Sequence, residues 1–240
     1  MPYRRLPNTD NARIRALENA LKKGEEFPPF KLAFKQSSLQ KAKYFLPEFK
    51  QAIIRQKEAL RNQVQKSQKY TDYLKKARIY VSHFIQVLNM AVSRGEFPEK
   101  EKSYYGLDIE SRKVPPLQTE HDIIEWGKKI IEGEKERLMN GGNPVTNPTI
   151  AVEKENYEQF MDAHHKQKSL QEINAAAHEK IVELRKEADE IILNIWNEVE
   201  DSFKELPQDL KRKKAEEYGL VYVFRKNEKN KEFANANYRV

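Results

Sequence analysis

Three residues in the second half of the sequence could together bind a metal ion. Glu158, Asp162 and His165 would share one helix face, at positions i, i+4 and i+7. Carboxylates and imidazoles in this arrangement bridge metal ions in some helical bundles. Such centres also need ligands on a facing helix, but the equivalent positions 111 residues earlier are Pro47, Gln51 and Ile54. We therefore interpret the three residues as solvated side chains and expect no cofactor.

Other catalytic motifs are also missing from the sequence. Without cysteine there is no disulfide, thiolate nucleophile or thiolate metal site. The segment "MNGGNPVTNPT" is rich in Gly and Asn but lacks the Lys followed by Ser or Thr that holds a nucleotide phosphate. There is no G-x-S-x-G sequence. We predict that the protein is not an enzyme.

Two groups of residues are candidates for contacting a partner. The first is Trp196 with its neighbours Asn194 and Asn197, although an aromatic residue at helical spacing is more typical of a core. The second is a basic run that would suit a polyanion, or would simply be solvated near a helix end. It consists of Lys211, Arg212, Lys213 and Lys214.

The composition favours an elongated helical protein over a large globule. Of 240 residues, 38% are apolar, and the mean hydropathy of −0.89 is low for one spherical core. No run of about 18 apolar residues occurs, which argues against a membrane span. The first residues, "MPYRRLPNTD", also lack the apolar stretch of a secretion signal. We expect a soluble, cytoplasmic protein that does not enter a membrane.

The net charge of +7 is divided unevenly along the chain. Residues 1–36 carry +4, 37–118 carry +8, 119–206 carry −9 and 207–240 carry +4. Basic and acidic segments in one chain are most simply explained by mutual attraction. A basic surface for a polyanion is the alternative.

Capping residues predict where two short helices begin and end. Thr9 and Thr119 each precede an amphipathic run with acidic residues in its first turn, as N-caps do. Gly24 and Gly141 lie where left-handed helix stops are expected. After a Pro-containing connection, Ser38 or Thr149 is a second capping candidate.

Two long helical segments follow these short helices. Pro47 is the only Pro or Gly from residue 38 to 94, and neither occurs from 149 to 206. Apolar residues recur at three- and four-residue spacing and thus predict seams that pack on other helices. The middle of each seam is polar.

The two halves resemble each other at an offset of 111 residues. The best evidence is the coincidence of apolar residues: Leu39/Ile150, Phe49/Phe160, Tyr73/Leu184, Ala77/Ala188, Val81/Ile192, Phe84/Ile195 and Leu88/Val199. We infer a duplicated unit of a short and a long helix. Residues 1–118 form the first, basic repeat and 119–206 the second, acidic repeat, packed together as one structural unit.

Two all-α architectures fit this pattern. In the first, each long segment is one helix, and the two cross in an elongated antiparallel bundle. In the alternative, each segment folds back near "KSQKYTD" or "KSLQE" to give a compact six-helix bundle. We favour the elongated form because neither stretch offers the Gly or Pro of a tight turn, although Ser169 with Glu172 would suit a helix start.

Residues 207–240 form a separate C-terminal segment. A short helix is predicted from Pro207 to a stop at Gly219. Beyond it, "LVYVFR" has β propensity and could pair with "EFANANYRV" in a hairpin. We therefore expect a small β-like tail.

Three stretches carry a likeness to known proteins: "MPYRRLPNTD", "ARIYVSHFIQVLN" and "ADEIILNIWNEVE…EYGLVYVFR". Through them the chain resembles a family of uncharacterised all-helical bacterial proteins. The likeness spans nearly the whole chain. It implies a helical, bacterial, self-contained protein, and it transfers no activity because the family has no established function.

The leading functional hypothesis is a non-enzymatic helical scaffold or adaptor for protein–protein interaction. Its partner would be another protein or a second copy in a homo-oligomer such as a dimer. The alternative is binding of nucleic acid or another polyanion through the basic first repeat and the tail. A metal-dependent enzyme using the three ligand candidates is the third hypothesis.

Overall fold

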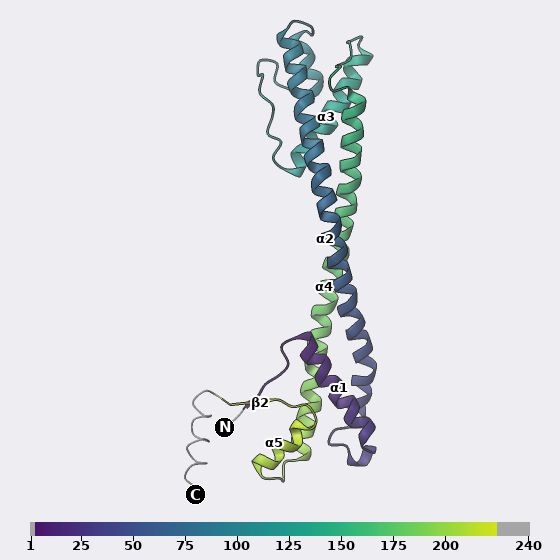
Figure 1. The fold of residues 1–240 in the computed structure, drawn as a ribbon, viewed down its shortest axis with the longest axis vertical. Helices are drawn as coiled ribbons and strands as arrows, with labels where there is room; N and C mark the ends of the chain where they lie inside the picture. Colours follow the sequence, from purple (N-terminus) through teal and green to yellow (C-terminus); the bar gives the residue numbers. More distant parts are fainter. Residues whose placement is uncertain (1–2, 225–240) are drawn as a thin grey trace. The chain divides into compact units, whose positions relative to one another are not determined.

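The protein is an all-α helical bundle, as predicted (Figure 1). The structure, a computed structural model, describes residues 3–224. They divide into two compact units, and we call residues 3–58 with 175–224 unit 1 and residues 59–174 unit 2. Helices α2 (Gln36–Ser93) and α4 (Ile150–Ser202) each contribute residues to both units. The predicted division at residue 118 concerns two sequence repeats and not these units, and it stays a prediction.

In unit 1, helix α1 (Asp10–Glu26) packs with the first part of α2 and the last part of α4. The predicted cap is confirmed, since the Thr9 hydroxyl accepts a hydrogen bond from the amide of Ala12. The predicted stop at Gly24 is wrong because α1 continues to Glu26. A Cβ at Gly24 would lie 2.5 Å from the Leu39 side chain, so this glycine permits close packing instead.

The C-terminal part of unit 1 contains the short helix α5 (Gln208–Glu216) and strand β2 (Tyr222–Val223). A 3-10 turn, η1 (Pro29–Lys31), connects α1 to α2. The partner of β2 is strand β1 (Tyr3–Arg4), and the two pair antiparallel. The second strand of the predicted hairpin falls among residues 225–240, outside the described residues.

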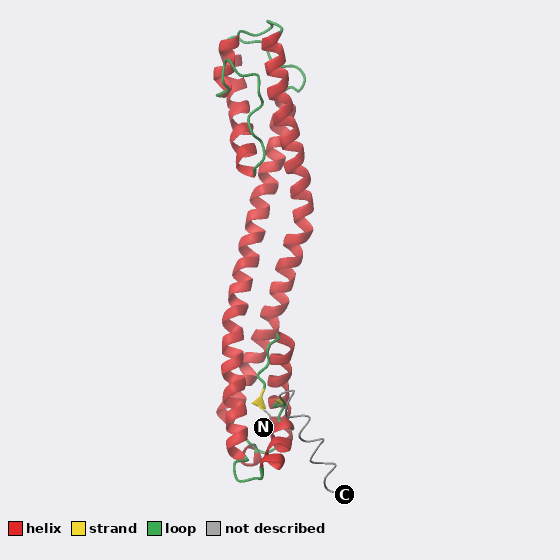
Figure 2. Cartoon of the chain, turned by 90° about the vertical axis from the view of Figure 1, so that its left-hand side faces the viewer, coloured by secondary structure: helices red, strands yellow, loops and turns green. Residues whose placement is uncertain are grey.

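Unit 2 combines α3 (Glu120–Met139), the last part of α2, the first part of α4 and the 3-10 helix η2 (Glu99–Tyr105). Thr119 and Asp122 form a complete capping box at the start of α3. Gly141, with φ of +83°, follows its end in the predicted left-handed conformation. Figure 2 shows loops joining the helices.

Both long segments are uninterrupted helices, so the predicted fold-back alternative is wrong. The "KSQKYTD" and "KSLQE" stretches are helical throughout. Helix α2 continues through the exposed Pro47. It also begins at Gln36, which places Ser38 inside its first turn and not at the N-cap. No described helix is both long and apolar enough to cross a membrane.

The two echoing stretches, 77–89 and 188–200, are both helical and bury matching positions. The buried pairs are Ala77/Ala188, Val81/Ile192, Phe84/Ile195, Ile85/Trp196 and Leu88/Val199. In addition, Gln63 and Asn174, which correspond at the same offset, are hydrogen-bonded at 2.8 Å. These features are consistent with duplication, which stays a prediction.

Candidate interaction groove

A groove in unit 1 runs between the start of α2 and the end of α4 and has a volume of about 800 Å³. Its floor includes the buried side chains of Phe45 and Ile191. Tyr44, which also lines the groove, is 78% exposed. A large exposed aromatic side chain beside a buried apolar floor is typical of an interaction site.

The charged residues that line this groove are mostly acidic, and we call it the acidic groove. Glu48, Glu187 and Glu190 are exposed there, against one cation, Lys41. The Glu48 carboxylate is 3.4 Å from the ammonium group of Lys180. The Glu187 and Glu190 carboxylates form no ion pair with a described residue. The groove therefore presents net negative charge to a ligand.

Asn194 is the sequence-predicted contact residue that lies in the acidic groove. Its amide nitrogen donates a hydrogen bond to the Ser38 hydroxyl at 3.0 Å, which joins α4 to the first turn of α2. The second amide candidate, Asn197, is exposed but does not line the groove.

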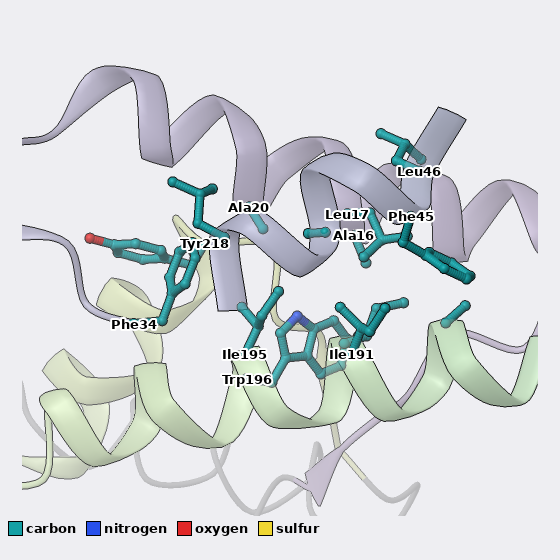
Figure 3. Packing of buried hydrophobic residues seen from close by; sticks show 14 of the residues in the cluster. Ala16, Leu17, Ala20, Phe34, Phe45, Leu46, Ile191, Ile195, Trp196 and Tyr218 are labelled. Atoms are coloured by element: carbon teal, nitrogen blue, oxygen red, sulfur yellow. The ribbon is translucent and has the colours of Figure 1, made fainter. Parts of the chain in front are cut away.

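Trp196 is a core residue of unit 1 and is 2% exposed. Figure 3 shows its indole pointing from α4 toward α1, where Ala16 and Leu17 lie. These neighbours belong to the same buried cluster. The side chain is therefore unavailable to a partner in the folded state.

The basic run on α5 is partly paired with carboxylates close to it in sequence. The guanidinium of Arg212 is 3.5 Å from the Asp209 carboxylate, and the Lys214 ammonium is 3.5 Å from that of Glu217. Lys213 is exposed and Lys211 is half-buried. Local carboxylates thus compensate part of this charge.

The structure does not gather the three metal-ligand candidates into a site. Glu158 is 3.7 Å from the ammonium of Lys154, while Asp162 lines a different groove, in unit 2. His165 packs against the ring of His164. Within residues 3–224, no group of three His, Cys, Asp or Glu side chains could hold a metal ion.

A buried charged cluster in unit 2 was not predicted. The Arg137 guanidinium lies 3.0 Å from the carboxylates of both Glu134 and Glu101, and the Tyr105 hydroxyl donates to Glu134. Burial opposes ionisation of Glu134, but its hydrogen bonds with Arg137 and Tyr105 hold its pKa below the usual value. Both charges are thus satisfied within the protein, and the cluster ties η2 to α3. The spacing of Glu134 and Arg137 at i and i+3 was its only sequence signal.

Glu153 is another buried ionisable residue that sequence reasoning missed. It is fully buried in the first turn of α4, and neither carboxylate oxygen has a hydrogen-bond partner among the described residues. Burial raises its pKa to about 8. Its place in the same helical stripe as Tyr157 and Phe160 could have revealed its burial.

Comparison with known proteins yields no match to a protein-family model, a curated protein or a solved structure.

Proposed function

We propose that the protein is a non-enzymatic helical adaptor whose acidic groove binds a basic amphipathic helix of a partner protein. The observation that carries this proposal is the combination of exposed Tyr44 with a buried apolar floor and unpaired carboxylates. Helix-in-groove recognition uses apolar anchors in this way.

The geometry of the groove suits a third helix. Two helices line it, and ridges of side chains on an incoming helix can pack between them at an axis distance of about 8–10 Å. Apolar residues at i, i+3 or i+4 of the ligand would contact Phe45 and Ile191. Tyr44 would supply the large amphipathic contact that is common at binding hot spots.

Charge selects the ligand. Basic residues beside the apolar stripe of the ligand would face Glu187 and Glu190, and like charges would exclude an acidic helix. Exposed charges act mainly on association rate and specificity, so the apolar contacts must supply most of the affinity.

Site-specific crosslinking tests this proposal. Replacing Tyr44 with a photo-crosslinking phenylalanine analogue in cells of the source organism should trap one partner, which mass spectrometry identifies. The matched control carries the analogue at Ile79, another exposed apolar residue of α2 outside the groove. The partner should crosslink from Tyr44 but not from Ile79.

Charge reversal then tests the groove itself. Glu187→Lys with Glu190→Lys should reduce the crosslinking yield at least fivefold, while circular dichroism stays unchanged because both side chains are exposed. Equal yields from Tyr44 and Ile79, or no effect of charge reversal, would contradict the proposal. A product of twice the mass of the chain would instead identify a second copy as the occupant.

A further inference from the structure

A second groove, in unit 2, differs from the acidic groove in charge and in lining. It lies between residues 66–73 of α2 and 159–170 of α4 and has a volume of about 620 Å³. Small-molecule sites commonly measure about 300–1,000 Å³. The groove is therefore large enough for a compact organic ligand.

Three exposed lysines line this second groove, which we call the lysine groove. Lys66 and Lys69 come from α2 and Lys166 from α4. None of the three forms an ion pair with any residue between 3 and 224, and Asp162 is the one carboxylate among the lining residues. Because three unpaired lysines from two helices line it, the groove favours an anion such as phosphate.

The floor of the lysine groove is aromatic and aliphatic. Tyr70 is buried, with its ring stacked on Phe160 at a centroid distance of 6.2 Å. Tyr73 and Leu170, which are half-buried, continue this surface on either helix. A rigid tyrosine beside aliphatic carbon provides a face on which a planar ring can stack.

Gln167 supplies a polar group without a partner in the same groove. Its side chain is only 7% exposed, yet its amide oxygen accepts no hydrogen bond from the described residues. This oxygen is itself inaccessible to solvent, so it meets a ligand N–H only when the Gln167 side chain turns toward the groove. That contact would favour binding, because a buried amide oxygen without a donor is unfavourable. The exocyclic amino group of a nucleobase is such a donor.

From these features we propose that the lysine groove binds a phosphorylated nucleoside. The phosphate lies among Lys66, Lys69 and Lys166, the base stacks against Tyr73 and Leu170, and Gln167 accepts a hydrogen bond from the base. This function is separate from the adaptor function, because the two grooves lie in different units and share no residue. The nucleotide is either free or part of a single strand, since both present the same groups.

The test uses the full chain with adenosine 5′-monophosphate and with a twelve-nucleotide oligodeoxyadenylate as probes. Binding is followed by NMR at low salt, through backbone amides and the side-chain amide of Gln167. Shifts centred on residues 66–73 and 159–170 are expected. Monophosphate binding identifies a free nucleotide as sufficient, and oligonucleotide binding alone, with shifts in the same residues, identifies a strand as the source.

Variants separate a built site from general charge attraction. Lys69→Glu with Lys166→Glu should weaken binding at least tenfold. Lys168→Glu, an exposed lysine on α4 outside the groove, should change it less than twofold. Gln167→Leu should also weaken binding at least fivefold, because the groove loses its hydrogen-bond acceptor. The fold should stay intact, and the net charge does not change.

Two results would overturn the proposal. One is the absence of shifts in the groove with either probe at millimolar concentration. The other is an equal loss of affinity in Lys168→Glu and in the groove variants, which would show attraction to the basic surface without a site.

Discussion

Glu153 combines full burial with the absence of any hydrogen-bond donor within the described residues. Its pKa is raised to about 8 by burial, far above the ordinary value of 4.5. Between these two values the unfolded chain carries the ionised carboxylate while the folded protein keeps the proton. Stability contributed by this residue is therefore highest below pH 4.5 and falls as pH rises toward 8.

Glu153→Gln should remove this pH dependence, because the amide resembles the protonated acid in shape and cannot ionise. The gain in free energy of unfolding should be near zero at pH 4.5 and reach roughly 2–4 kcal/mol at pH 8. Urea unfolding at several pH values measures it. A Trp196→Phe background leaves Trp126, in unit 2, as the fluorescent reporter.

Glu155→Gln is the matched control for this experiment, since Glu155 lies on the same helix and is exposed. It should change stability by less than about 0.5 kcal/mol at any of these pH values. A gain from Glu153→Gln that is the same at every pH would show that ionisation is not the cause.

At the scale of elements, Gly133 in α3 explains why η2 can lie so close to α3. A Cβ at this position would lie 2.6 Å from the carbonyl oxygen of Tyr104 and 2.8 Å from the ring of Tyr105. Since the first obstacle is backbone, a small side-chain rotation cannot relieve the overlap. Glycine therefore occupies this helical position, although the intrinsic helix propensity of alanine is more favourable by about 1 kcal/mol.

Gly133→Ala should lower the stability of unit 2 by roughly 1–3 kcal/mol, because overpacking outweighs the gain in helix propensity. Gly24→Ala, also inside a helix, meets only the end of the flexible Leu39 side chain and should cost less than about 1 kcal/mol. Thermal unfolding by circular dichroism compares the two variants. Equal effects would mean that propensity, and not contact with η2, determines the outcome.

These helices could largely be predicted because their signals are local. Thr9 and Thr119 identify two helix starts, and the apolar stripes identify the long helices. Gly24 misled the prediction, since the sequence does not distinguish a helix stop from a close contact. Helix η2 has no regular apolar period, and it is held by a cluster centred on the distant Arg137.

The two grooves could be predicted only in part. Asn194 was a candidate from sequence, but its neighbours in the acidic groove include Tyr44 and Glu48, far away along the chain. Knowledge of which faces of α2 and α4 meet is needed to bring these residues together. Trp196 was also a candidate from sequence, yet it is a core residue, although Asn194, two residues away, lines the acidic groove.

At the scale of the whole molecule, the basic and acidic segments contact each other differently from the expected pattern. Among residues 3–224, the ion pair that joins α2 to α4 is Glu48 with Lys180, in which the supposedly basic helix supplies the acid. Acidic residues of α4 pair mainly with the N-terminal region: Asp189 with Arg13 and Glu200 with Arg4. Charge in unit 1 therefore holds α1 and the N-terminus against α4.

Salt should consequently affect the two units unequally. In unit 1, two doubly hydrogen-bonded pairs join α1 to α4, Arg13 with Asp189 and Arg185 with Asp10, and all four side chains are partly exposed. Arg185 holds the pKa of Asp10 below its usual value. In unit 2, by contrast, the Arg137–Glu134 pair is shielded from solvent. Salt screens exposed pairs strongly and buried pairs weakly.

Hydrogen exchange with mass spectrometry can resolve this difference between α1 and α3. Raising sodium chloride from 50 mM to 500 mM shortens the screening length to about 4 Å. Protection of residues 10–26 should then fall roughly threefold to tenfold, because exposed pairs contribute about 1 kcal/mol or less each, while residues 120–139 change less than twofold. The variant Asp10→Asn with Asp189→Asn should lose protection at low salt and show no further loss at high salt. If the variant kept the full salt response, these two ion pairs would not be the source of that response. The apolar face of α1 alone would then have to hold this helix against α4.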